Sequence, residues 1–348
     1  MKILIDLSIL KNVNCGLGQV ALNYGYYFRD TYTPIEGETI YLLVPKSFVG
    51  AFGDKVRYIQ ARKILRVFPF LTGIRFDVWH AIHQLSRYWP FARHYVLTIH
   101  DFNFVYEKHG SKVAKYMLFI QKKVKRADRI VCISRFAAIE TERYMRLHGK
   151  EVQVIYNGIE RIDQQPDQQP TAVSAEQPFL FTIGECKEKK NFHVLLDMMR
   201  YLPQYQLYIA GKDDTDYAQF IRKKIADDGL TNVHLLGIVS SAERVWLYRH
   251  CAAFVFPSLF EGFGLPVLEA MLFRKPVICS RETGLVEIGS EHVSFFLVDY
   301  PAKESADLIA STIQNATPAQ LEAAFRYAAS YSWQRHMEEY LRIYRTIS

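Results

Sequence analysis

Short apolar segments alternate with longer amphipathic segments along nearly the whole chain, and this alternation constrains the fold more than any other feature. The apolar segments are KILID, TIYLLV, DVWHA, YVLTIH, RIVCI and VQVIY in the first half, then FLFTIG, YQLYIA, NVHLLG, AAFVF and PVICS in the second. Continuously apolar strands are typical of parallel sheets, because helices cover both faces of such sheets. The sequence therefore predicts an α/β protein with doubly wound parallel sheets.

One segment, residues 161–178, interrupts the alternation. It reads RIDQQPDQQPTAVSAEQP and has no apolar periodicity, which is typical of a linker. The length of 348 residues suits about two domains. We therefore expect an N-terminal domain over residues 1–165 and a C-terminal domain over residues 178–332.

The cysteines and the apolar segments indicate the compartment. The five cysteines are scattered without a C-x-x-C pair, so the sequence suggests neither a disulfide framework nor a zinc site. The N-terminal stretch MKILIDLSIL is too short and too interrupted for a signal peptide, and no uncharged apolar stretch reaches the ~18 residues of a membrane-spanning helix. We expect a cytoplasmic protein.

The positive charge is concentrated in the first half. Residues 1–160 hold 24 Lys and Arg against 13 Asp and Glu, whereas residues 161–348 hold 19 against 23. Unless it is an ordinary solvated face, this excess favours an anionic partner such as a membrane surface. The basic segments 55–76 and 108–129 also contain many apolar residues, so they are candidates for contact with an anionic membrane. A nucleic acid is not expected, because no binding module is recognisable.

The stretch PSLFEGFGLPVLEAM, residues 257–271, follows an apolar strand and places Glu261 and Glu269 eight positions apart. Gly262 and Gly264 permit backbone conformations that side chains forbid, and Pro266 is favourable near the start of a helix. Free N–H groups at that helix start favour an anion, and carboxylates can accept hydrogen bonds from vicinal hydroxyls. Two carboxylates beside an anion site suit a nucleotide or a sugar. Helix capping by Glu261 and solvent exposure of Glu269 are the alternatives.

This stretch resembles the E-x7-E motif of retaining glycosyltransferases with the GT-B fold, particularly the bacterial mannosyltransferase-like members of glycosyltransferase family 4. The similarity extends to GECKEKKN, LYIAGKDD and VHLLGIVS in the second half, and to CGLG, TIHDFNF, CISRF and VIYNGIE in the first. The resemblance implies an N-terminal acceptor-binding domain, a C-terminal domain that binds a nucleotide sugar, and a last helix, at about residues 333–348, that packs back on the first domain.

The resemblance also implies roles for residues of the second half. Glu261 matches the glutamate that contacts donor-sugar hydroxyls, and Glu269 the one that holds the ribose. Lys190 matches the lysine that binds the diphosphate, where a cation stabilises the charge of the leaving group. Glu185 and Lys189 occupy the positions where the family often has an arginine. The backbones of the remaining candidates should face the diphosphate or the base; they are Gly184, Gly237, Val239, Phe263, Gly264 and Leu265.

In the first half the resemblance points to His100, which would lie beside the donor sugar, and to Gly16 and Gly18, which would close over the donor phosphates. A histidine packed at a strand end is the alternative for His100. The segment GLGQVA also fits the dinucleotide motif G-x-G-x-x-A. It lies about ten residues beyond the first strand and no acidic residue ends the second, so a nicotinamide dehydrogenase is not favoured.

The resemblance implies a retaining enzyme that transfers a hexose from a nucleotide sugar, with GDP-mannose as the expected donor, to a glycan or lipid-linked glycan. No cofactor or metal is expected. Asp214 and Asp216 follow YIAG, but the family that the sequence resembles has a variable loop there, and no D-x-D of the kind that metal-dependent glycosyltransferases use ends a strand. A peripheral position at the inner face of the plasma membrane would suit a lipid-linked acceptor. A nucleotide-sugar-binding protein or an epimerase of the same fold is the alternative.

Overall fold

The computed structural model divides the chain into two compact units, which we describe separately. Unit 1 combines residues Met1–Glu160 with the terminal segment that begins at Tyr331, and unit 2 comprises residues Arg161–Ser330. The described residues are 1–13, 15–107, 110–174, 176–297 and 299–347.

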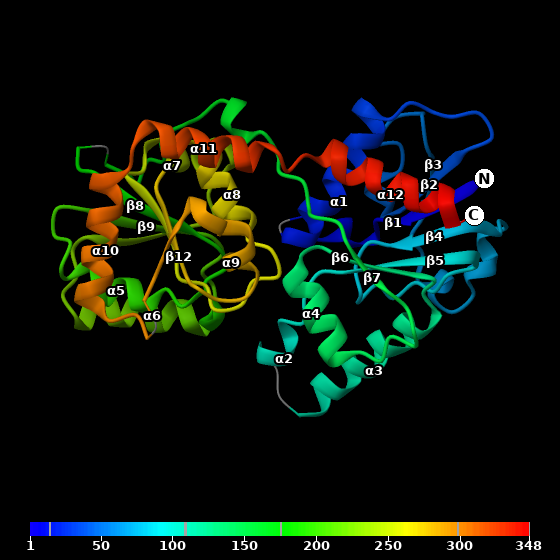
Figure 1. The fold of residues 1–348 in the computed structure, drawn as a ribbon, viewed down its shortest axis with the longest axis horizontal. Helices are drawn as coiled ribbons and strands as arrows, with labels where there is room; N and C mark the ends of the chain where they lie inside the picture. Colours follow the sequence, from blue (N-terminus) through cyan, green and yellow to red (C-terminus); the bar gives the residue numbers. More distant parts are fainter. Residues whose placement is uncertain (14, 108–109, 175, 298, 348) are drawn as a thin grey trace. The chain divides into compact units, whose positions relative to one another are not determined.

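Unit 1 is built on a seven-stranded sheet in the order β3-β2-β1-β4-β5-β6-β7, in which every pairing is parallel (Figure 1). Its strands are β1 (Lys2–Asp6), β2 (Thr39–Val44), β3 (Arg57–Gln60), β4 (Phe76–Ala81), β5 (Ala92–Ile99), β6 (Arg129–Cys132) and β7 (Val152–Val154). Ile3 of β1 lies opposite Ile40 of β2 and Val78 of β4, so the centre of the sheet is apolar across neighbouring strands. All three residues are buried, as the continuous apolar segments predict.

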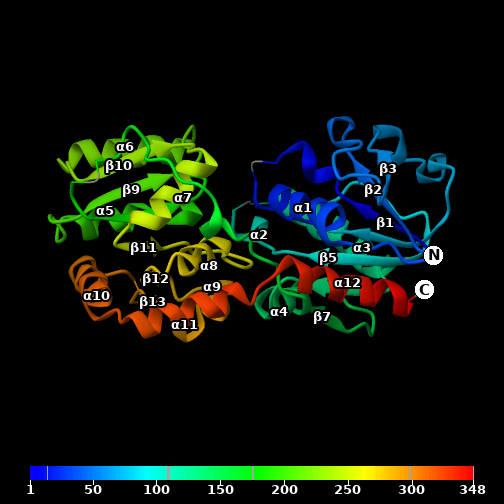
Figure 2. The same cartoon turned by 90° about the horizontal axis from the view of Figure 1, so that it is seen from above.

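The helices of unit 1 come from both ends of the chain. They are α1 (Gly16–Tyr26), α2 (Phe104–Glu107), α3 (Ser111–Arg126), α4 (Arg135–Tyr144) and α12 (Trp333–Ile347), with a π-helical turn, η2 (Tyr27–Thr31), directly after α1. In Figures 1 and 2 the red helix α12 lies beside the blue and cyan elements of this unit. Its apolar face, which includes Met337, Leu341 and Ile343, belongs to the same core as β1 and β2.

Two tyrosine hydroxyls of α12 enter that core and are hydrogen-bonded there. The Tyr344 hydroxyl lies 2.5 Å from His80 Nδ1, and the Tyr340 hydroxyl lies 2.7 Å from Thr98 Oγ1. His80 Nε2 is also 2.8 Å from Thr98 Oγ1. Buried polar groups are costly without partners, so these bonds make α12 an integral part of unit 1.

His336 adds a second link between α12 and the rest of unit 1. Its ring nitrogens lie 2.7 Å from the Tyr156 carbonyl oxygen and 2.8 Å from the Tyr24 hydroxyl. Just before the helix, an isolated parallel bridge pairs Ile159 with Ser332. The chain therefore leaves unit 1 and returns to it along adjacent segments.

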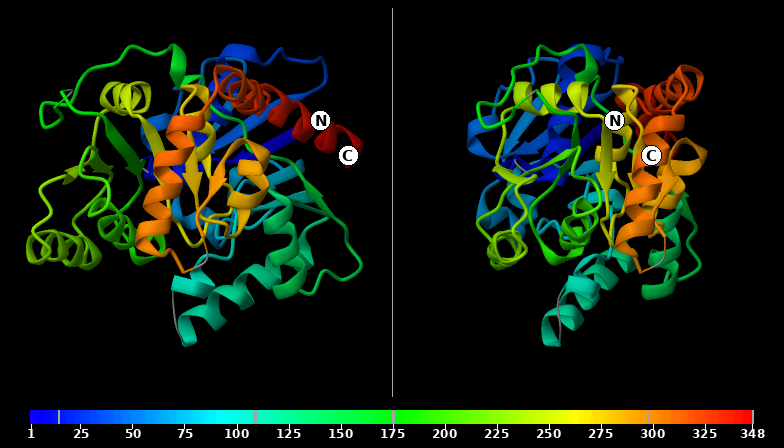
Figure 3. Two further views of the ribbon diagram at one scale, coloured as in Figure 1. Left: turned by 60° about the vertical axis from the view of Figure 1, so that its left-hand side comes forward. Right: turned by 90° about the vertical axis from the view of Figure 1, so that its left-hand side faces the viewer.

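Unit 2 contains a six-stranded parallel sheet in the order β10-β9-β8-β11-β12-β13. Its strands are β8 (Phe179–Ile183), β9 (Gln206–Ala210), β10 (Val233–Gly237), β11 (Ala253–Phe256), β12 (Val277–Cys279) and β13 (Ser294–Phe295). Its helices are α5 (His193–Met199), α6 (Asp216–Asp227), α7 (Ser241–His250), α8 (Leu265–Leu272), α9 (Gly284–Gly289), α10 (Ala302–Asn315) and α11 (Pro318–Ala329). Figure 3 shows α10, in orange, lying along the yellow strands.

The fold class expected from the sequence is confirmed, with differences at the sheet edges. The apolar alternation does not predict β3 or β13, both of which are short edge strands. β3 reads RYIQ and lies inside the basic segment 55–76, where its charges hide the strand pattern.

The proline-rich stretch at the start of unit 2 is packed against α7. The Arg249 guanidinium donates to the carbonyl oxygens of Asp163 and Gln165 and forms an ion pair of 2.7 Å with Asp167. The Gln168 N–H donates to the Ala242 carbonyl oxygen at 3.1 Å. The stretch lacks apolar periodicity because polar contacts hold it.

In both sheets the order in which successive strands are added reverses at the first strand. In unit 1 the order turns between β1 and β4, and in unit 2 between β8 and β11. Ligands of such sheets bind beyond the carboxyl ends of the strands at this switch point. None of the helices in the described part of the chain combines the length and hydrophobicity that crossing a bilayer requires.

Removing one hydroxyl from α12 tests its role in unit 1. Tyr344→Phe leaves a buried ring nitrogen of His80 without its partner, so we expect the free energy of unfolding to fall by about 1–3 kcal/mol. Urea unfolding followed by tryptophan fluorescence reports mainly on unit 1, which holds Trp79, Trp89 and Trp333 of the four tryptophans. The exposed Tyr201→Phe is the matched control, and equal stability of both variants contradicts the expectation.

The buried histidines predict acid sensitivity of unit 1. Burial lowers the pKa of His336 to about 3 and the pKa of His80 well below its usual value. Both titrate near ~6.5 in the unfolded chain, which therefore binds more protons than the folded chain below that pH. We expect the urea midpoint to fall as the pH drops below ~6.5. The exposed His148→Gln should keep this dependence, whereas a midpoint independent of pH would refute it.

Candidate active site

The switch point of unit 2 brings together two of the predicted site residues, Lys190 and Glu261. Gly184 follows β8, and the short turn η7 (Glu188–Lys190) comes shortly after it. The segment 257–264 connects β11 to α8. Lys190 Nζ lies 2.5 Å from Glu261 Oε1, and the two side chains are 12% and 16% exposed. The pair is thus mostly buried yet still reaches solvent.

Further contacts fix Glu261 in place. The Ser258 hydroxyl donates to Glu261 Oε1 at 2.8 Å, and the Glu261 N–H donates to Thr283 Oγ1 at 3.0 Å. Burial by itself raises the pKa of Glu261, but the Lys190 ammonium and its hydrogen bond outweigh burial, so the pKa lies below its usual value. Glu261 is therefore a preoriented carboxylate that keeps its charge at neutral pH.

Lys190 is held by close packing as well as by charge. Its ammonium lies 4.8 Å from the centroid of the Phe256 ring. A Cβ atom at Gly184 would lie 2.9 Å from Lys190 Cε, so a larger residue there would require the end of the lysine chain to shift. This packing gives Gly184 a steric role beside its predicted role near the diphosphate.

The loop before α8 has the backbone geometry expected of an anion site. Gly264 precedes the first helical residue, Leu265, with φ of 105°, and a Cβ there would lie 2.5 Å from Leu285 Cδ2. Phe263 is buried at 4% exposure, so its side chain is packed inside the unit. Pro266 has no N–H, and the Val267 N–H donates to the Gly264 carbonyl oxygen at 3.0 Å, so this helix start suits an anion mainly through the helix dipole.

Glu269 lies on α8, away from the Lys190 pair in sequence but within the same unit. It accepts a hydrogen bond of 2.9 Å from the Tyr248 hydroxyl and lies 3.5 Å from the Arg244 guanidinium. Both partners belong to α7. Sequence reasoning missed Tyr248 and Arg244, because α7 has the pattern of an ordinary surface helix. Glu269 is 15% exposed, so the alternative of a solvated helix residue does not hold.

The remaining donor-site predictions in unit 2 lie at or beyond strand ends. Gly237 ends β10 with φ of 68°, and a Cβ there would lie 3.5 Å from Asp213 Oδ1. Val239 lies between β10 and α7 and is half-buried. The Lys189 carbonyl oxygen accepts from the Leu259 N–H at 2.8 Å, which ties the two switch-point segments together.

Unit 1 holds the other predicted residues. His100 follows β5 and is buried; its Nε2 lies 2.8 Å from the Ile82 carbonyl oxygen, and burial lowers its pKa to about 4. It is therefore a neutral imidazole. Gly16 opens α1 beside empty space, whereas a Cβ at Gly18 would lie 2.1 Å from the Asn12 carbonyl oxygen. Packing alone requires glycine at the second position.

The switch point of unit 1 also contains polar residues that the sequence analysis did not select. Asp6 ends β1 and accepts a hydrogen bond from the Ser86 hydroxyl. His83 follows β4 and is 7% exposed, and its Nδ1 is buried without a hydrogen-bond partner among the described residues. In the sequence, these residues could have been identified as site candidates by their positions at the end of β1 and after β4.

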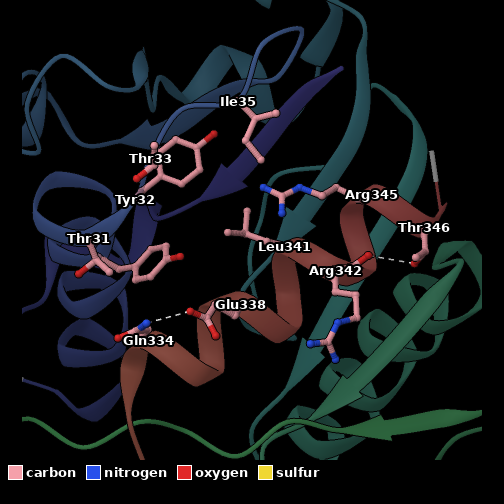
Figure 4. Close-up of a pocket in the computed structure, with 11 residues that line it drawn as sticks. Thr31, Tyr32, Thr33, Ile35, Gln334, Glu338, Leu341, Arg342, Arg345 and Thr346 are labelled. Atoms are coloured by element: carbon pink, nitrogen blue, oxygen red, sulfur yellow. Dashed lines mark hydrogen bonds between the residues drawn. The ribbon is translucent and has the colours of Figure 1, made fainter.

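A hollow of about 520 Å³ in unit 1 lies elsewhere, between α12 and residues 31–35 (Figure 4). Arg345 at its rim is bound to Glu38, and Glu338 accepts a hydrogen bond from Gln334. None of the predicted site residues lines it. In the described residues no group of three or more His, Cys, Asp and Glu side chains is arranged to hold a metal ion.

Two α/β units with all-parallel sheets define the GT-B class of fold. Residues 27–161 match the family model for Glycosyltransferase Family 4, and residues 163–330 match the model for Glycosyl transferases group 1. Together the two models span most of the chain. The chain belongs to the GT-B glycosyltransferases of the family 4 type, as the motifs of its sequence predict.

Relatives and a solved structure are consistent with this assignment. The chain is 32% identical over 189 residues to the mannosyltransferase WbdA of Escherichia coli, across 49% of this chain and 23% of WbdA. It is 27% identical over 195 residues to the O-antigen chain mannosyltransferase RfbU of Salmonella typhimurium, across 55% of this chain and 53% of RfbU. The structure of Anabaena HepE in complex with UDP and glucose matches 99% of this chain and 100% of its own, with 17% identity and a TM-score of 0.77.

Replacing Lys190 tests the buried pair. In Lys190→Met, Glu261 loses its cation, so we expect the pKa of Glu261 to rise. The free energy of unfolding should fall by about 1–3 kcal/mol at neutral pH. In the wild type, the lowered pKa of Glu261 contributes stability that is present above ~4.3 and is lost as the pH falls through the folded pKa. The deficit of the variant should therefore shrink in acid.

Lys187→Met is the matched control, because its pair with Glu185 is exposed. Urea unfolding of both variants between about pH 7 and about pH 4 makes the comparison. Equal losses for the two variants, or a deficit that does not change with pH, would be inconsistent with a buried, charged Glu261.

Proposed function

We propose that this chain transfers a hexose from a nucleotide-sugar donor to a glycan or lipid-linked glycan, with retention at the anomeric carbon. The observation that carries the proposal is the preformed Lys190–Glu261 pair at the unit 2 switch point. GDP-mannose is the proposed donor, which the mannosyltransferase relatives support. A UDP-sugar is the alternative, because HepE was solved with UDP.

In this proposal unit 2 binds the donor. Lys190 and the positive end of the α8 dipole receive the diphosphate, and the half-buried Lys189 adds a second cation. Glu261 accepts hydrogen bonds from sugar hydroxyls. Glu269 holds the ribose, with Tyr248 fixing its orientation. The backbone at Gly237 and Val239 contacts the base.

The transfer step follows from these roles. The bond between the anomeric carbon and the diphosphate oxygen breaks, and the acceptor oxygen bonds to the same face of that carbon. The acceptor proton passes to the departing phosphate oxygen. Lys190 stabilises the negative charge that develops on this leaving group, so a fixed cation performs the electrostatic work. No divalent metal is required in this scheme.

We assign acceptor binding to unit 1. His100 is the residue proposed to lie beside the donor sugar, where a neutral imidazole can exchange a hydrogen bond with a hydroxyl. The acceptor belongs to lipopolysaccharide or O-antigen assembly, as in the relatives. Such acceptors are attached to lipid, so the enzyme works at the cytoplasmic face of an anionic membrane.

Thermal unfolding with GDP, UDP, ADP and dTDP tests the donor site. A nucleotide at a hundredfold excess over its dissociation constant stabilises the protein by about 2.7 kcal/mol. We expect GDP to raise the midpoint most, and Glu269→Gln and Lys190→Met to lose most of that gain. The exposed Glu291→Gln should keep it.

A preference for UDP would overturn the choice of donor but not the site. No response to any nucleotide, or an equal response in all the variants, would overturn the site. Consumption of GDP-mannose without an acceptor would favour an epimerase, and nucleotide binding without transfer to any acceptor pool would favour a binding protein.

A further inference from the structure

Unit 1 exposes a compact cluster of large apolar side chains between β3 and β4. The cluster consists of Ile64, Val67, Phe68, Phe70 and Leu71, which are 46%, 69%, 43%, 53% and 55% exposed. Five such side chains within eight residues are unusual, because isolated exposed apolar residues are the norm on a protein surface. We call these five residues the apolar turn.

The apolar turn is an ordered structure with satisfied backbone groups. Its five residues lie in or between two 3-10 turns, η4 (Lys63–Arg66) and η5 (Pro69–Thr72). The N–H groups of Val67 and Phe68 donate to the Ile64 carbonyl oxygen, and the Leu71 N–H donates to the Phe68 carbonyl oxygen. The exposure of these side chains therefore does not come from a lack of local structure.

Two residues anchor the apolar turn to unit 1. Leu65 points inward and is 5% exposed. The guanidinium of Arg66 lies 5.4 Å from the centroid of the Tyr88 ring. With these side chains turned inward, the five apolar side chains project outward on a fixed base.

The charged residues of the segment that carries the apolar turn are all positive. Residues 55–76 contain six Lys and Arg and no Asp or Glu. Arg62, Lys63 and Arg75 are exposed on either side of the turn. Apolar side chains with cations on either side in the sequence match an anionic lipid surface, where the cations meet headgroups and the apolar groups enter the acyl boundary.

We propose that the apolar turn is the element that inserts into an anionic membrane, held there by the flanking cations. The inference rests on the proposed function for the lipid-linked acceptor, and it names the partner surface of the acceptor-binding unit. Half-exposed side chains of this size present about 100 Å² each, or roughly 500 Å² together. That is short of the ~800 Å² that each partner buries in a standard protein interface, so a bilayer suits the cluster better than a second protein.

The second basic segment of the sequence has a different surface. Helix α3 exposes Lys112, Lys115, Lys122 and Lys125, while Leu118 is its one exposed large apolar residue among those described. Lys123 of the same helix is buried and donates to the Tyr88 carbonyl oxygen and the Tyr95 hydroxyl. Helix α3 can attract anionic lipid, but it has no apolar face to insert.

Flotation of the purified full-length chain with vesicles tests the proposal. We expect binding to vesicles of phosphatidylcholine and phosphatidylglycerol, and much weaker binding to phosphatidylcholine alone. Phe68→Ser combined with Phe70→Ser should reduce binding to the anionic vesicles at least tenfold. Ile139→Ser, which removes a side chain that is 61% exposed on α4 of the same unit, should not change it.

Insertion can be separated from simple adsorption. Phe70→Trp places a reporter in the turn, and brominated phosphatidylcholine in the anionic vesicles should quench its fluorescence more than that of the wild type. Equal quenching in the two proteins would mean that the turn stays outside the bilayer and would overturn the proposal.

Further outcomes also decide against the apolar turn. Unchanged binding by the double serine variant, with loss of binding in Lys122→Ser/Lys125→Ser, would assign the membrane surface to α3. Self-association of the wild type without vesicles, abolished by the serine pair, would assign the turn to a second copy of the chain. Nucleotide binding measured on the same proteins should be unaffected, so failure at the membrane is distinguishable from failure of the donor site.

Discussion

The integrity of unit 1 depends on hydrogen bonds that cross from α12 into its core. His80 and Thr98 lie buried on adjacent central strands, and hydroxyl groups from α12 satisfy both of them. Tyr24 of α1 is satisfied in the same way by His336. An apolar helix would bury as much surface at this position. The hydrogen bonds also fix the orientation of α12, because a rotated helix would leave several buried polar groups without partners.

Unit 2 has a different organisation, with an apolar core and a polar pair at its edge. Around Lys190 and Glu261, glycine and hydroxyl residues hold each charge in a defined place before any ligand arrives. Desolvating two charges is costly, and the short contact between them offsets that cost. A cation that is already oriented needs little rearrangement when negative charge develops beside it, which is the physical advantage of such a site in group transfer.

The elements that could be predicted are those with a regular pattern of apolar residues in the sequence. Strands that are buried on both faces consist of consecutive apolar residues, so the two sheets can be predicted from the sequence. The position of Glu261 after such a strand placed it at the correct edge. Edge strand β3 could not be predicted, because it is four residues long, begins with an exposed arginine and has no fully buried residue, so it has no continuous apolar pattern.

Contacts made across the fold leave no mark in the local sequence. Nothing in RVWLYRH indicates that Tyr248 and Arg244 approach Glu269, since that depends on how α7 packs beside α8. The orphaned nitrogen of His83 is likewise visible only when the surrounding atoms are known. The basic segments illustrate the same limit: their compositions are similar, yet one presents apolar side chains outward and the other buries them.

The return of the chain to unit 1 has a consequence for biosynthesis. Unit 2 is one continuous segment inserted between β7 and α12, so a ribosome completes it before α12 emerges. Until then the apolar residues that α12 covers are exposed, and His80, Thr98 and Tyr24 lack their partners on that helix. Incomplete units of this kind are prone to aggregation and are typical clients of chaperones. Stalled or truncated translation products that lack α12 should therefore be degraded or held by chaperones, even though most of their sheet is already present.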